Sequence, residues 1–139
     1  MSKSLAQKYW LGIDIGSVSF SYVLINQNRQ ILKKDYLLHQ GNIFELLQEK
    51  LAEIDLARVH QVAYNHKSSD FFAAGMSVNE QVALIEGIRY QQENVRSVFT
   101  IGGETFGLIL FDENNRYQKY IANSSCAAAF ASLRICSSS

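Results

Sequence analysis

Residues 11–39, LGIDIGSVSFSYVLINQNRQILKKDYLLH, share one plan with residues 98–123, VFTIGGETFGLILFDENNRYQKYIAN. Each stretch has an apolar run, a turn of glycine and other small residues, a second apolar run, an Asn- or Asp-rich turn and a third run. Such runs predict β-strands, and short polar turns predict that consecutive strands pair antiparallel. We therefore expect two meanders of three strands each.

The sequence between the two meanders predicts mainly helices. In residues 42–54, NIFELLQEKLAEI, apolar side chains recur at helical spacing, and Asn42 precedes them as a candidate N-cap. Residues 58–65 predict a short strand and residues 78–94 a second helix, whereas residues 66–77, HKSSDFFAAGMS, carry no clear pattern. The apolar stripe of the first helix should lie against the sheet and consists of Ile43, Leu46, Leu47, Leu51 and Ile54.

A duplicated meander with a helical crossing between the copies resembles the organisation of the actin-like and hexokinase-like ATPases. In those proteins two ribonuclease-H-like lobes hold a nucleotide. The resemblance implies an α/β fold with one such lobe and the opening β-meander of a second. Residues 1–94 would form the first lobe with its linking helix, residues 95–136 the truncated start of the second lobe, and residues 137–139 a disordered tail.

Composition excludes several classes of function. With 139 residues, 47% of them hydrophobic, the chain is within the usual size of one domain and can bury one core. Its 13 basic and 13 acidic residues balance, so we expect neither nucleic acid nor an anionic membrane as a partner. No run approaches the roughly 18 apolar residues of a membrane span. Since the first residues lack a signal-peptide pattern, the two cysteines are interpreted as thiols in a reducing cytoplasm.

The first turn, GIDIGSVS at residues 12–19, is a candidate phosphate-binding loop. Gly12 and Gly16 let the backbone approach a ligand closely, and the amides from Gly16 to Val18 form a candidate donor cluster for a phosphate oxygen. Asp14, at the end of the predicted strand, is a candidate magnesium ligand through water. The alternative for this motif alone is a hairpin whose glycine and serine residues only form the turn.

Three segments in this order resemble one ATPase family: LGIDIGSVSFSYVLIN (11–26), NEQVALIEGI (79–88) and IGGETFGLILFDENNRYQKYIANSSCAA (101–128). They are similar to the BadF/BadG/BcrA/BcrD-type ATPases, the activators of 2-hydroxyacyl-CoA dehydratases and benzoyl-CoA reductases, and especially to the N-terminal segment of CoA-substrate-specific enzyme activases. The resemblance implies an ATPase that couples ATP hydrolysis to low-potential electron delivery, with one [4Fe-4S] cluster held between two subunits. It also implies a CoA-dependent dehydratase or reductase component as partner.

The resemblance implies roles for individual positions. Glu80 matches the acidic residue of the helix that links the lobes. Related ATPases carry an acidic residue before the second phosphate loop, where this chain has Thr100, and Glu104 is the candidate substitute. Cys126 matches the first cluster cysteine and lies near a predicted helix start, which favours the thiolate; without the resemblance it would be interpreted as a small buried thiol.

The candidate site residues fall into three groups. The candidate catalytic residues are Asp14, Glu80 and Glu104, and the candidate nucleotide-binding residues are Gly12, Gly16, Ser17, Ser19, Gly102 and Gly103. The candidate metal ligands are Asp14 for magnesium and Cys126 for the cluster.

The chain departs from the family after Cys126. The family continues with a glycine–threonine–glycine turn, where this chain has Ala129, Phe130 and Ala131. The second cluster cysteine and the adenosine-binding part of the family are not reached. We therefore expect a fragment that is not catalytically competent alone and binds ATP or ADP with Mg²⁺ weakly or not at all. The alternative function is a non-catalytic actin-like module for interaction or dimerisation.

A homodimer is expected from the second meander, which lacks the strands and helices that normally complete such a lobe. Apolar side chains without cover recruit partners, as do exposed strand edges. The residues expected to lack part of their cover are Ile101, Leu108, Leu110 and Phe111.

Overall fold

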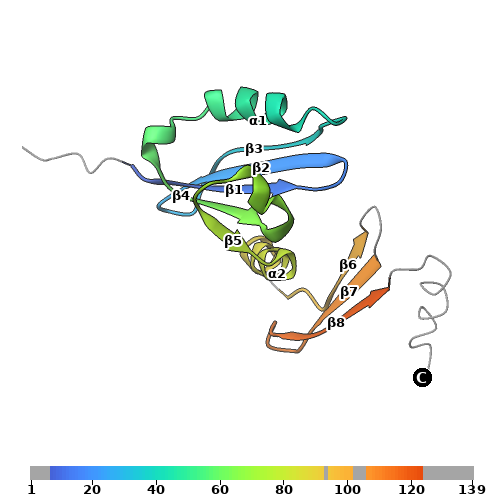
Figure 1. The fold of residues 1–139 in the computed structure, drawn as a ribbon. Coiled ribbons are helices and arrows are strands. Elements are labelled where there is room, and N and C mark those ends of the chain that lie inside the picture. Colours follow the sequence, from blue (N-terminus) through green and yellow to red (C-terminus); the bar gives the residue numbers. More distant parts are fainter. Residues whose placement is uncertain (1–6, 93, 102–105, 124–139) are drawn as a thin grey trace, which may run out of the picture. The chain divides into compact units, whose positions relative to one another are not determined.

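The computed structural model describes residues 7–92, 94–101 and 106–123. The chain divides into two compact units, residues 1–83 and residues 84–139. Each unit contains its own β-sheet (Figure 1).

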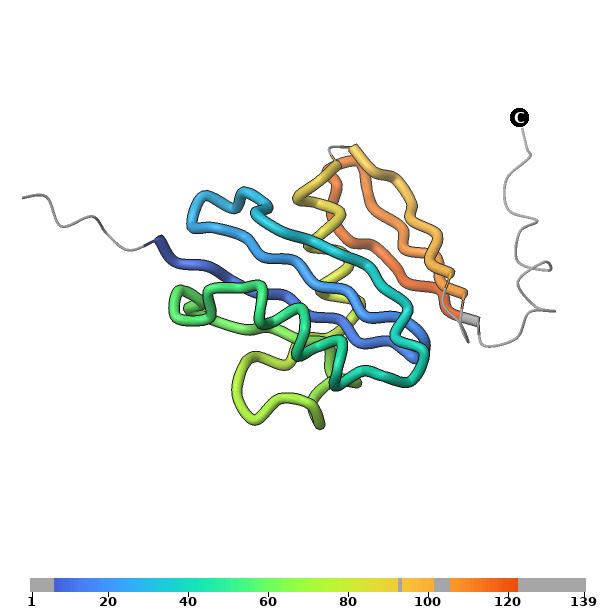
Figure 2. The backbone as a smooth tube through the Cα atoms, turned by 90° about the horizontal axis from the view of Figure 1, so that it is seen from above, coloured from blue at the N-terminus to red at the C-terminus, as the bar shows by residue number. Residues whose placement is uncertain are grey.

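The first unit is built on a five-stranded sheet. Its strands are β1 (Tyr9–Ile15), β2 (Ser19–Asn26), β3 (Ile31–Leu38), β4 (Val59–Asn65) and β5 (Met76–Val78). Its helical segments before β5 are α1 (Ile43–Ala52) and the 3-10 helices η1 (Leu56–Arg58) and η2 (His66–Phe71). The strand order is β3-β2-β1-β4-β5; β1, β2 and β3 form the predicted antiparallel meander, and β4 and β5 are parallel to β1. In Figure 2 the meander strands lie side by side in blue to cyan.

The turn between β2 and β3 is held by the side chain of Asn26. Its Oδ1 accepts hydrogen bonds from the backbone N–H groups of Asn28 at 2.9 Å and Gln30 at 3.0 Å. Arg29 completes the turn with a left-handed φ of 61°. Because an asparagine that binds the backbone just ahead of it favours a turn, this connection is determined locally.

One face of the sheet is covered by α1, as its apolar stripe predicts (Figure 1). All five stripe residues pack in one cluster, with Leu47 and Ile54 buried. The predicted cap is wrong, because Asn42 makes no side-chain cap hydrogen bond. Its φ of −93° and ψ of 54° lie outside the extended conformation that an N-cap residue normally adopts. The strand residues of the cluster are Leu11, Ile13, Ile15, Phe20, Tyr22, Leu24 and Tyr64.

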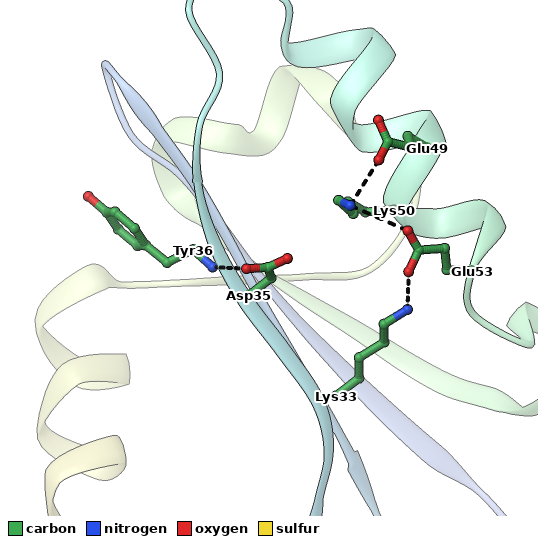
Figure 3. A network of polar contacts seen from close by, with 6 residues as sticks. All are labelled: Lys33, Asp35, Tyr36, Glu49, Lys50 and Glu53. Atoms are coloured by element: carbon green, nitrogen blue, oxygen red, sulfur yellow. Dashed lines mark hydrogen bonds and ion pairs between the residues drawn. The ribbon is translucent and has the colours of Figure 1, made fainter.

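An ion-pair network joins α1 to the edge strand β3 (Figure 3). Glu53, just after α1, accepts from Lys33 Nζ of β3 and from Lys50 Nζ at 3.3 Å. The hydrogen bond from Lys33, followed by the one from Lys50, holds the pKa of Glu53 below its ordinary value. Charged side chains on β3 also discourage another strand from pairing with this edge.

Residues 66–77, which carry no clear sequence pattern, form η2 and the approach to β5. Phe72 stacks on Tyr64 of β4 with the ring centroids 4.7 Å apart. Gly75 has φ +131°, and a Cβ there would lie 2.9 Å from the Tyr64 ring. Contacts with β4 therefore determine this segment.

The second unit contains a three-stranded sheet. Its strands are β6 (Ser97–Ile101), β7 (Phe106–Phe111) and β8 (Tyr117–Asn123). They pair antiparallel in sequence order, as the second meander predicts. The β7–β8 turn repeats the first one: Asp112 Oδ1 accepts from the N–H groups of Asn114 and Arg116, both at 2.9 Å, and Asn115 has φ 58°. The duplication in the sequence is therefore also present in the turns.

A small apolar cluster forms the core of the second unit. Ile109 and Phe111 of β7 are buried with Ile85 of α2 (Glu80–Gln91), a helix that crosses the boundary between the units. The expectation that Phe111 lacks cover is wrong, because the alternation along β7 places it on the same face as Ile109. Ile101 is 72% exposed. None of the helices within the described ranges is long and apolar enough to cross a membrane.

Candidate functional site

The carboxyl ends of β1 and β4 meet at one edge of the five-stranded sheet, because these strands are parallel neighbours. Asp14 and the loop from Gly16 to Val18 lie at the end of β1, and Asn65 ends β4. Open α/β sheets bind their ligands beside the carboxyl ends of their strands. Asp14 and the first candidate loop therefore lie where such a fold places its ligand-binding site.

Asp14 is held by Asn65, a residue 51 positions away in the sequence. The Asn65 Nδ2 donates to Asp14 Oδ1 and lies 3.3 Å from the carbonyl oxygen of Ile15. Asn65 is itself oriented by Ser68, whose hydroxyl donates to Asn65 Oδ1 and accepts from the Ile15 N–H at 3.2 Å. Ser68 is 0% exposed. This chain of hydrogen bonds keeps the Asp14 carboxylate at the end of β1.

Sequence reasoning missed both Asn65 and Ser68. The available signal was local: an asparagine at the end of a predicted strand, with a serine three residues later. Nothing in their spacing relates them to Asp14, because two strands, β2 and β3, and two helical segments, α1 and η1, separate β1 from its parallel neighbour β4 in the sequence.

The pKa of the Asp14 carboxyl is raised. Burial by its surroundings is the largest cause and the negative charge of Glu80 the second, whereas the charge of Lys67 lowers the pKa. Glu80 begins α2, where Asn79 Oδ1 accepts from the Gln81 N–H at 2.9 Å and caps the helix. Lys67 Nζ lies 3.6 Å from Glu80 Oε2. The site therefore combines two carboxylates with one ammonium group.

Asp14→Asn is expected to raise the free energy of unfolding at neutral pH. A carboxyl whose pKa is raised on folding binds its proton more tightly when folded. Its ionisation therefore destabilises the fold as the pH rises from the ordinary value of 3.8 through the raised pKa. Asparagine removes the charge and keeps an oxygen that can accept from Asn65. Urea unfolding followed by Trp10 fluorescence should show a gain that disappears below pH 3.8; a variant less stable than the parent at neutral pH would contradict this.

The backbone of the first loop is partly engaged in its own turn. Gly16 N donates to Ser19 O at 2.8 Å, so this amide is not available to a ligand. Within the described part of the chain, no acceptor binds the amides of Ser17 and Val18. A Cβ at Gly16 would lie 3.2 Å from Ser19 Oγ and would crowd the turn. The Ser17 and Val18 amides are therefore the ones in this loop that remain for a ligand, and their role toward a phosphate oxygen stays a prediction.

Gly12 lies inside β1 rather than in the loop. It shares the face of Asp14, because residues two apart in a strand point to the same side. A Cβ at Gly12 would lie 3.2 Å from Val23 Cγ1 of β2, so the glycine accommodates its neighbouring strand. Its role toward a nucleotide stays a prediction.

Four candidate residues, Gly102, Gly103, Glu104 and Cys126, lie outside the described residues. The position before the second loop is described: Thr100 of β6 pairs with Gly107 of β7. The roles of the four residues remain predictions.

Asp14 and Glu80 have the chemistry that a magnesium ion requires. Mg²⁺ takes oxygen ligands and usually keeps several waters, with one or two carboxylates and phosphate oxygens. In the three described ranges, no group of three or more His, Cys, Asp or Glu side chains could hold a metal ion. Two carboxylates suit a magnesium ion that arrives with a nucleotide, and this role of Asp14 and Glu80 stays a prediction.

Two curated proteins are similar in sequence to this chain. No family model matches it. Over 128 residues it is 23% identical to the 2-hydroxyisocaproyl-CoA dehydratase activator of Clostridioides difficile, covering 86% of this chain and 47% of that protein. Over 122 residues it is 25% identical to an uncharacterized protein of Methanocaldococcus jannaschii, covering 85% of this chain and 49% of that protein.

Two solved structures are similar to this fold. One is the activator of the 2-hydroxyisocaproyl-CoA dehydratase from Clostridium difficile with bound ADPNP, with a TM-score of 0.70, 18% identity, and coverage of 86% of this chain and 47% of that one. The other is component A of the Acidaminococcus fermentans (R)-2-hydroxyglutaryl-CoA dehydratase, with a TM-score of 0.67, 21% identity, and coverage of 86% and 49%.

This chain has the actin-like ATPase fold of the dehydratase activators. The predicted fold class and the predicted resemblance are thereby confirmed. The chain spans about half the length of the curated relatives it matches.

Proposed function

We propose that this chain is the nucleotide-binding part of an ATP-dependent activator of a 2-hydroxyacyl-CoA dehydratase. The observation that carries the proposal is the Asp14–Asn65 contact beside a loop whose Ser17 and Val18 amides are open to a ligand. The similarity to dehydratase activators supports it, because one of those structures holds ADPNP.

Each residue of the site has a role in this proposal. The Ser17 and Val18 amides donate to oxygens of a nucleotide phosphate. Asp14 and Glu80 would hold the magnesium ion of the nucleotide, which supplies positive charge to the phosphate oxygens. Asn65 keeps the Asp14 carboxylate in place before the ligand arrives, so less ordering is needed on binding. Lys67 adds a positive charge next to Glu80.

Nucleotide binding by this chain alone is proposed to be weak. Phosphoryl transfer depends on a site that positions the phosphates and excludes water. The chain corresponds to about half of the activator it resembles, and its described part contains one phosphate loop. ATP hydrolysis and electron delivery are therefore assigned to the whole activator, and the phosphate loop to this chain.

Calorimetric titration with MgATP, together with amide NMR spectra, tests this proposal. We expect weak binding that shifts the Ser17 and Val18 amide signals. Asp14→Asn should remove mainly the magnesium-dependent part, because the backbone donors remain. Sub-micromolar affinity would contradict weak binding by this chain. Spectra unchanged at high MgATP concentration would refute nucleotide binding and favour the alternative, a non-catalytic actin-like module for interaction or dimerisation.

The iron–sulfur part of the proposed function depends on Cys126, outside the described residues. A [4Fe-4S] cluster requires four thiolates, and a symmetric homodimer of this chain would supply two through Cys126. We propose a homodimer on the ground of the second meander. Because two thiolates are too few, this homodimer should hold no stable cluster by itself. The proposed partner is a CoA-dependent dehydratase component, following the name of the relative. Cysteines that ligate iron must stay reduced, which favours the cytoplasm.

A further inference from the structure

His39 connects the phosphate loop to the turn between β3 and α1. It follows directly after β3 and is buried, with 8% of its surface exposed. Its ring Nε2 lies 3.2 Å from the carbonyl oxygen of Gly16, and its backbone N–H donates to the carbonyl oxygen of Val18 at 3.1 Å. One residue therefore binds both ends of the loop from Gly16 to Val18.

The contacts of the His39 ring select one tautomer. The backbone N–H of Gly41 donates to Nδ1 at 3.1 Å, so Nδ1 is the acceptor and carries no proton. Gly16 O can only accept, so Nε2 must be the donor. Both contacts are satisfied together by the tautomer with its proton on Nε2.

The bond to Gly16 determines the direction of the next amide. In a planar trans peptide, the carbonyl of one residue and the N–H of the following residue point in opposite directions. Because His39 holds the Gly16 carbonyl toward itself, the Ser17 N–H points away from His39. The Gly16 N–H is already bound to Ser19 O, so Ser17 is the first amide in the loop that can reach a ligand.

We propose that His39 is the positioning residue of this site, which aims the Ser17 amide at a nucleotide phosphate without touching the ligand. The inference rests on the proposed nucleotide binding and adds to it a residue outside the motif. In this inference, the buried His39 preorganises the phosphate loop. An amide that is already held in place loses less conformational entropy when the ligand binds.

Two substitutions separate the two ring contacts. In His39→Gln, the amide nitrogen of the new side chain reaches the position of Nε2 and can still donate to the Gly16 carbonyl. In His39→Asn, the amide oxygen of the shorter side chain reaches only the position of Nδ1 and can still accept from Gly41. Each variant keeps one hydrogen bond, so a purely structural role predicts similar losses in both. His60→Asn is the matched control, because His60 is exposed on β4, with its ring centroid 5.7 Å from that of Trp10 in a T-shaped arrangement.

The probe is ADPNP with magnesium, followed by amide NMR titration of the full chain. We expect His39→Asn to bind about tenfold more weakly than the parent, the loss expected when a hydrogen bond to a charged phosphate is misdirected. His39→Gln and His60→Asn should stay within about threefold of the parent. Equal affinities of His39→Asn and His39→Gln for ADPNP would contradict the role of His39 but would leave the proposed nucleotide binding intact. Absence of binding by the parent chain would refute the proposed function, and this inference with it.

A second measurement does not depend on the variants being folded. Long-range proton–nitrogen NMR spectra of the parent chain report which ring nitrogen of His39 carries the proton. We expect the proton on Nε2 and an unprotonated Nδ1. The opposite tautomer would remove the donor to the Gly16 carbonyl and would overturn the inference.

Discussion

Phe20→Ala is expected to lower the free energy of unfolding of the first unit by about 3–5 kcal/mol, the usual cost of removing a buried aromatic ring. Phe20 is 1% exposed and among the largest fully buried side chains. It lies opposite Ile15 on β1 and Leu37 on β3, near the start of the central strand of the meander. Neighbouring strands on both sides cannot collapse into the cavity without losing their register, so most of the cost should remain.

Urea unfolding followed by tryptophan fluorescence reports on the first unit, because the single tryptophan, Trp10, lies in β1 of that unit. Phe99→Ala is the matched control. Phe99 is 49% exposed on β6 of the second unit, so its removal should leave the Trp10 transition almost unchanged. Equal shifts for Phe20→Ala and Phe99→Ala would contradict the assignment of Phe20 to the core.

The same substitution should also weaken nucleotide binding. Phe20 pairs with Ile15, whose backbone N–H and carbonyl oxygen are bound by Ser68 and Asn65. Because Asn65 also binds Asp14, even a small adjustment at the end of β1, with the strand register unchanged, would displace the carboxylate. The core and the site are therefore coupled through the end of β1.

Gly107→Val is expected to destabilise the second unit by about 1–3 kcal/mol, the usual cost of overpacking. A Cβ at Gly107 would lie 2.5 Å from Thr100 Oγ1 on one neighbouring strand and 2.5 Å from the Tyr120 ring on the other. Contacts this short require movement. Thr100 can turn its Oγ1 away only by changing its χ1 rotamer. Tyr120 packs against the cluster of Ile109 and Phe111, so its ring cannot move without a further loss.

Amide hydrogen exchange in β6, β7 and β8 measures the stability of this unit directly. Gly87→Ala provides the opposite control. Gly87 lies in α2, and apart from the backbone of the helix itself an added Cβ would meet nothing within 4 Å, so alanine should stabilise the helix by up to about 1 kcal/mol. Unchanged exchange in Gly107→Val would show that Thr100 and Tyr120 adapt freely.

Local features of the sequence were sufficient to predict much of the fold. Both meanders, the covering helix and the second helix follow from hydrophobic periodicity, which depends only on near neighbours. The two polar turns are also local, since Asn26 and Asp112 each bind backbone N–H groups two and four residues ahead. Two local expectations were wrong. Asn42 precedes its helix but makes no side-chain cap hydrogen bond, and its backbone is outside the extended conformation usual for a cap. Phe111 is covered by its own unit.

The sequence by itself determined where β1 ends and that Asp14, Gly16 and Ser17 lie at that end. Only the tertiary structure decided which residues surround them. Asn65 and Ser68 reach Asp14 and Ile15 across more than 50 positions, because β4 is the parallel neighbour of β1. His39 reaches Gly16 across 23 positions, because β3 returns to the start of β2. Strand periodicity specifies which face a side chain occupies but not which distant strand lies beside it. The pairing of strands therefore decided the contacts that orient this site.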